Sequence, residues 1–195
     1  MIKTPKIEFV YSFIYDRMLN KNKKLASRPA IFKTIKDIEK LWKKEEKKIL
    51  TEIVKVTSSK WKEDKIKCYI ISNFPVPPFS DPLTMPLPKK KDYIHFIDTL
   101  VHELLHQKLI QEDKYFDYWD NFIEKKFKDE LFNTKVHILV HAIHKHIYLK
   151  FYNKKRLQHD INYCKKIGKG YSKAWAIVNK HGYKNIIKEF KNNTK

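Results

Sequence analysis

Two histidines and a glutamate are spaced so that they can bind a metal ion and activate water. His102, Glu103 and His106 form the pattern H-E-x-x-H. Residues four apart lie one above the other on the same face of an α-helix, so both imidazoles can reach one ion. Glu103, one residue on, is then placed to take a proton from a water at that ion. The pattern predicts a zinc site with two ligands, an open coordination position and a general base.

The residues around this pattern are apolar and favour a helix that is largely buried. Chance gives about 0.02 matches to the pattern in a chain of this composition. The apolar neighbours are Ile97, Leu100, Val101, Leu104, Leu105 and Leu109. Buried polar groups need partners, and a metal ion would provide one. The alternative is two satisfied core histidines beside a surface glutamate.

The segment His102-Glu103-Leu104-Leu105-His106 resembles the active-site helix of the zincins, the H-E-x-x-H zinc metallopeptidases. The resemblance implies that His102 and His106 bind zinc and that Glu103 polarises the attacking water. It also implies an edge strand before the helix that holds a peptide substrate, and residues 83–87 occupy that place. An ordinary covering loop is the alternative there, because six of the chain's eight prolines lie between residues 73 and 91.

A catalytic zinc site normally has a third protein ligand, which must come from elsewhere in the chain. The metzincin extension is absent, since Leu109 replaces its glycine and Glu112 its histidine. The layout is closer to gluzincins, which take a glutamate from a later helix, or to SprT-like peptidases, which take a histidine. We predict His141, because it is central in a stripe of histidines and is followed by the small Ala142. The open alternatives are His137, His144, Glu124 and Glu130.

The elements that must position these residues indicate an α+β fold. We expect a small N-terminal sheet with a backing helix, the active-site helix and a mainly helical C-terminal half. The expected strands cover 6–15, running into a short helix at 16–19, and 66–72. The expected helices cover 30–56, 92–108, 115–132, 135–152, 171–180 and 183–190. Asp92 and residues 133–134 are the expected helix caps, and Gly182 fits a helix C-terminus. We predict a single domain over 1–195, divided into a sheet-containing part, 1–91, and a helical part with the metal site, 92–195.

The composition indicates an intracellular globular protein with a strongly basic surface. Formal net charge is +20, from 42 lysines and arginines against 22 acidic residues. Such a charge suits nucleic acid, although only three of the basic residues are arginines, and solvated lysine faces are the alternative. Two cysteines are too few for a disulfide scaffold and favour a reducing compartment. No apolar run has the length of a membrane span, and Glu8, Asp16 and Arg17 interrupt any signal-peptide pattern. We therefore expect a cytoplasmic location and no membrane partner.

These observations together predict a zinc-dependent metallopeptidase acting on peptide or protein substrates. Two other classes stay open. One is a nucleic-acid-associated, SprT-like peptidase or binding module that uses the lysine-rich surface. The other is a non-catalytic structural zinc protein with a closed, four-ligand site. The sequence gives no indication of the oligomeric state.

Overall fold

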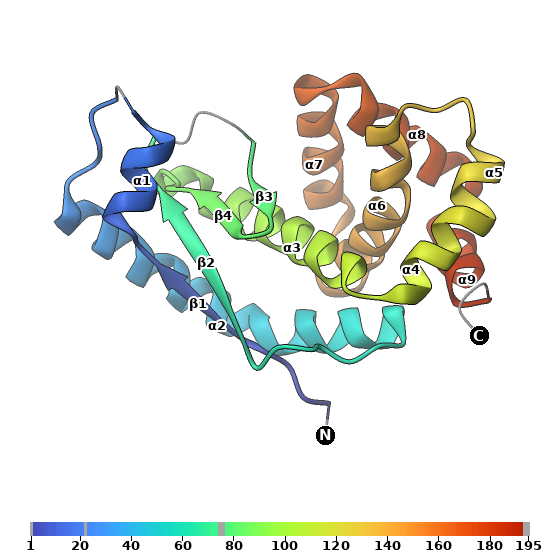
Figure 1. The fold of residues 1–195 in the computed structure, drawn as a ribbon, viewed down its shortest axis with the longest axis horizontal. Helices are drawn as coiled ribbons and strands as arrows, with labels where there is room; N and C mark the ends of the chain where they lie inside the picture. Colours follow the sequence, from blue (N-terminus) through green and yellow to red (C-terminus); the bar gives the residue numbers. More distant parts are fainter. Residues whose placement is uncertain (1, 22, 74–76, 193–195) are drawn as a thin grey trace. The chain divides into compact units, whose positions relative to one another are not determined.

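The computed structural model of the chain describes residues 2–21, 23–73 and 77–192. Its elements form two compact units. The first comprises Met1–Thr51 with Lys60–Gln107, and the second Glu52–Ser59 with Lys108–Lys195. The β-sheet lies in the first unit and the second is helical, so the predicted α+β class is confirmed (Figure 1). The predicted division of the chain into two parts lay after residue 91, whereas the two units divide after Gln107. The prediction that they form a single domain stays a prediction.

The described part of the first unit contains a four-stranded mixed sheet with the order β1-β2-β4-β3. The strands are β1 (Lys6–Val10), β2 (Lys65–Ile71), β3 (Phe79–Ser80) and β4 (Leu83–Pro86). Strand β2 pairs in parallel with both β1 and β4, and the short β3 pairs antiparallel with β4. The segment 83–87, predicted as an edge strand, forms β4 over Leu83–Pro86. Its first two residues, Leu83 and Thr84, pair with β3, so β4 is not at the edge of the sheet there. Residues 74–76 of the predicted proline-rich loop lie outside the described residues.

Strand β1 ends five residues before the predicted boundary at Tyr15. The Ser12 side chain accepts a hydrogen bond from the Tyr15 backbone N–H at 3.3 Å, and helix α1 (Phe13–Leu19) begins there. A serine in this position satisfies an N–H that has no partner within the helix. Helix α1 then carries the fully buried Asp16, whose carboxylate accepts from the Ser72 backbone N–H at 3.1 Å and its hydroxyl at 2.6 Å. Those bonds tie α1 to the end of β2.

Two long helices accompany the sheet in the first unit. Helix α2 (Arg28–Thr57) extends slightly beyond the predicted range at both ends. Its Glu46 carboxylate accepts from the backbone N–H of Ile7 on β1 at 3.0 Å, which places α2 as the backing helix. Helix α3 (Tyr93–Ile110) carries the H-E-x-x-H pattern and follows the short turn η1 (Lys90–Asp92). Asp92, the expected cap, is instead the last residue of η1.

The predicted helix over 115–132 is interrupted. The structure has α4 (Asp113–Tyr118), a π-helical turn η2 (Trp119–Ile123) and the short α5 (Glu124–Lys126). Tyr118 and Ile123 are both buried, and they are five residues apart. A π-turn has the i to i+5 spacing that puts two such residues on one face, whereas a regular helix would turn one of them outward.

The remaining helices form the rest of the second unit. Helix α6 (Phe132–Phe151) begins three residues before the predicted start, so the expected caps at 133–134 lie inside its first turn. Helix α7 (Lys154–Ile167) was not predicted, and the Asn153 side chain caps it by accepting from the Arg156 N–H at 2.9 Å. Helices α8 (Lys169–His181) and α9 (Tyr183–Asn192) meet at Gly182, whose φ of 81° confirms its predicted role. Among the described residues, every helix is too short or too polar to cross a lipid bilayer.

Candidate metal centre

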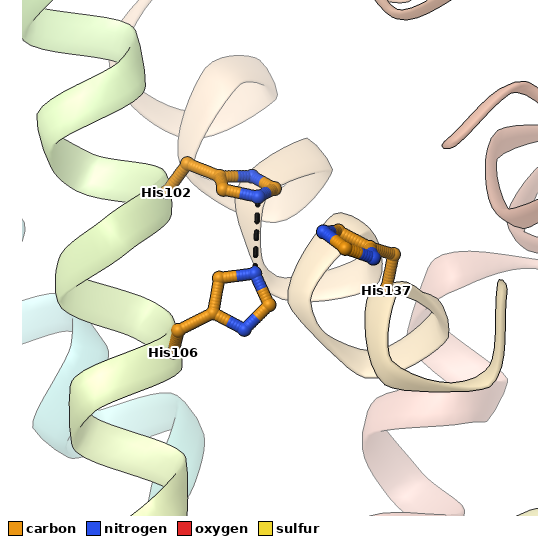
Figure 2. Close-up of side chains that lie close together, drawn as sticks. All are labelled: His102, His106 and His137. Carbon is orange, nitrogen blue, oxygen red and sulfur yellow. Dashed lines mark hydrogen bonds between the residues drawn. The ribbon is translucent and has the colours of Figure 1, made fainter. Parts of the chain in front are cut away.

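The two motif histidines project from one side of α3 with their rings close together. Both are half-buried, and their Nε2 atoms lie 3.1 Å apart (Figure 2). Two imidazole nitrogens bound to a tetrahedral zinc at 2.0–2.1 Å would lie about 3.3 Å apart. The spacing of His102 and His106 therefore fits a shared metal ion with little adjustment. The buried apolar residues of α3 fix the orientation of this side of the helix.

Glu103 is buried beside this pair and faces the sheet of the first unit. Its side chain is 7% exposed, and burial raises its pKa to about 7. Burial and, secondarily, the negative charge of Glu103 raise the pKa of the Cys68 thiol on β2. A carboxyl group with a pKa near neutrality is suited to accept a proton and later return it. Glu103 therefore has the environment that the predicted general base requires.

A further candidate ligand, His137, belongs to the second unit. His137 lies on helix α6 in the second unit, whereas His102 and His106 lie on α3 in the first unit. His137 is one of the alternatives that the sequence left open for the third ligand. The predicted ligand His141 lies on the same helix as His137.

The His137 ring is held in the tautomer that metal binding needs. Its Nδ1 lies 2.7 Å from the Asn133 carbonyl oxygen. Because a carbonyl oxygen can only accept, Nδ1 carries the hydrogen, and in the neutral ring Nε2 is the unprotonated nitrogen. Burial lowers the pKa of His137, and the bond to Asn133 offsets part of that shift. The net lowering of the pKa favours the neutral imidazole, which is the form that binds metal.

The other histidines of the stripe lie in the core of the second unit. His141 is fully buried and stacks on Trp175, with ring centroids 4.4 Å apart and planes inclined by 14°. His144 stacks on Tyr148 at 4.5 Å, and burial lowers its pKa to about 3. The assignment of His141 as a zinc ligand stays a prediction.

The two glutamates considered as ligands are engaged in ion pairs. Glu124 accepts from the Lys135 ammonium at 2.6 Å. Glu130 lies 3.3 Å from the Lys173 ammonium. Each carboxylate thus has a lysine partner within the second unit, as expected for a charged helical surface.

Comparison with known proteins gives no match to a family model, to a curated protein or to a solved structure.

Proposed function

We propose that this protein is a zinc-dependent hydrolase that cleaves peptide bonds. The observation that carries the proposal is the α3 pair, His102 and His106, with nitrogens 3.1 Å apart and the buried Glu103 between them in sequence. The donor set of imidazoles suits zinc, and three such ligands leave one position open for water or substrate. Of the candidates on α6, His137 is the third ligand in this proposal, because its bond to the Asn133 carbonyl fixes the tautomer of its ring.

The chain's own residues have distinct tasks in the proposed reaction. Zinc, when bound, supplies Lewis acidity, which lowers the pKa of water and polarises a carbonyl group. Glu103 accepts the proton of the attacking water and passes it to the amine nitrogen as the peptide bond breaks. The Asn133 carbonyl keeps the His137 ring in its binding orientation.

The test separates binding from catalysis. Zinc-loaded wild type and Glu103→Gln are compared on a pool of internally quenched fluorogenic peptides, with zinc content measured on the same samples. We expect Glu103→Gln to keep its zinc and to lose at least a factor of about 100 in turnover, since a positioned general base contributes that much or more. His159→Ala, a change at an exposed histidine that is not a candidate ligand, should keep both zinc and turnover. Full turnover by folded, zinc-loaded Glu103→Gln would refute the assigned role of Glu103.

A further inference from the structure

Helix α1 buries its acidic residue and turns apolar side chains outward. Asp16 is fully buried, and its carboxylate accepts hydrogen bonds from the Ser72 backbone N–H and hydroxyl and, at 2.8 Å, from the Asn20 side-chain amide. Three large apolar side chains of the helix are 43%, 66% and 64% exposed, namely Phe13, Ile14 and Met18. A surface helix normally turns its apolar side toward the core. The bonds to Asp16 therefore hold α1 in the opposite orientation.

The exposed apolar surface continues onto the first turns of α2. Phe32 is 50% exposed, and its ring centroid lies 6.1 Å from that of Tyr11, just before α1. The guanidinium of Arg28, the first residue of α2, lies 5.8 Å from the centroid of the Phe13 ring. Figure 1 shows α1 and the start of α2 at the same end of the first unit. We define the apolar patch as Phe13, Ile14, Met18 and Phe32.

The exposed charged side chains of this segment are all positive. Arg17 and Arg28 each place a guanidinium 5.8 Å from the centroid of the Phe13 ring. The exposed lysines of the same segment are Lys21, Lys23, Lys24, Lys33 and Lys36. Between residues 12 and 36 the sequence has one acidic residue, Asp16, and that residue is fully buried. A partner of the patch must therefore combine an apolar phase with negative charge.

The chemistry of the patch favours a lipid surface over nucleic acid. Its two most exposed members, Ile14 and Met18, lack the flat ring on which a base would stack. The Phe13 ring has two guanidinium groups beside it. Side chains that are about two-thirds exposed protrude, and a lipid surface accepts protruding apolar groups without a matching groove. Anionic headgroups would at the same time neutralise the bases.

We propose that the apolar patch docks this protein on an anionic phospholipid surface. Phe13, Ile14 and Met18 enter the boundary between headgroups and acyl chains, and the arginines lie against the lipid phosphates. Lying on a surface needs no spanning segment, so the proposal replaces the sequence-based expectation of no membrane partner. It goes beyond peptide hydrolysis and does not depend on the metal centre, because every residue it uses belongs to the first unit.

Co-sedimentation of the untagged, full-length protein with vesicles tests the proposal. We expect at least about tenfold stronger binding to phosphatidylcholine vesicles with about 30% phosphatidylserine than to phosphatidylcholine alone. Ile14→Ser with Met18→Ser should weaken binding to the anionic vesicles about tenfold at constant net charge, because two side chains no longer insert. The matched control is Ile2→Ser with Ile94→Ser, at exposed positions of the same unit outside the patch. It should leave binding within about twofold of wild type.

A second pair of variants tests the charges. Arg17→Gln with Arg28→Gln should weaken binding to the anionic vesicles about 20-fold, because each base near such a surface contributes about a factor of five. Lys43→Gln with Lys47→Gln removes the same charge from exposed positions further along α2 and should change binding by less than about threefold.

Three outcomes would overturn the proposal. The first is wild type that does not sediment with the anionic vesicles. The second is an equal loss of binding in the patch variants and their controls, which would show diffuse charge attraction. The third is binding of a single-stranded oligonucleotide, lost in Arg17→Gln with Arg28→Gln, by protein that binds no vesicles. That result would make this end of the first unit a nucleic-acid surface.

Discussion

The buried His144 should make the stability of the protein depend on pH in a calculable way. Burial lowers its pKa to about 3 in the folded chain, against an ordinary value near 6.5 when unfolded. Between these values the unfolded chain binds a proton that the folded chain does not. Stability therefore falls as pH decreases below about 6.5. Integrated from pH 7 to pH 5, this one group lowers the free energy of unfolding by about 2 kcal/mol.

The assay is urea unfolding at pH 7 and pH 5 for wild type and His144→Leu. The variant should lose about 2 kcal/mol less than wild type between the two pH values, whatever its absolute stability. Ile143→Val, a change at the fully buried neighbour, is the control. It should lower stability by about 1 kcal/mol at both pH values, because it removes a methyl group and no titrating group. Equal pH dependence in wild type and His144→Leu would refute the reasoning.

Two further predictions concern buried acids. Burial alone raises the pKa of Glu52, but the bonds from Lys150 and His146, both 2.7 Å, bring it below its usual value. Glu52 thus stabilises the fold above about pH 4.3, and this contribution is lost as pH falls through the folded-state pKa. Glu52→Gln should be less stable than wild type at pH 7 and should lose less stability on acidification, as followed by urea unfolding. An equal loss of unfolding free energy on acidification in Glu52→Gln and wild type would contradict this. Asp16→Asn should lower the free energy of unfolding by about 2 kcal/mol, because it places a donor against the Ser72 donors. A loss below about 0.5 kcal/mol would show that the network rearranges without cost.

Local patterns in the sequence predicted most of the helices and the fold class, because those patterns are short in range, but they missed α7. The apolar spacing on either side of His102 defined α3, and the alternation around Cys68 defined β2. The wrong boundaries have local causes that periodicity does not report. Ser12 ends β1 by capping α1, and a π-turn at Trp119–Ile123 interrupts the helix before α6. These are hydrogen-bonding effects that leave the apolar spacing almost unchanged.

The third ligand depends on helix phase, which the sequence leaves undefined. Residues four apart on a helix are rotated by about 40°, so His137 and His141 face different neighbours while sharing one stripe. The stacking of His141 on Trp175 involves residues 34 apart, and only the tertiary structure brings them together. The carbonyl of Asn133, which orients His137, is also invisible in a pattern of residue types. The metal centre stays a proposal, and the choice between His137 and His141 as its third ligand is one that the sequence pattern does not decide.

Zinc content per chain tests the central claim most directly. Elemental analysis is made on untagged wild type and on the single variants His106→Ala, His137→Ala and His141→Ala after zinc is supplied and excess removed. The proposal predicts one zinc in wild type and in folded His141→Ala, with the metal lost from His106→Ala and His137→Ala. Zinc retained by His137→Ala but lost from folded His141→Ala would move the third ligand to His141. Wild type that takes up no zinc would contradict the metal centre itself.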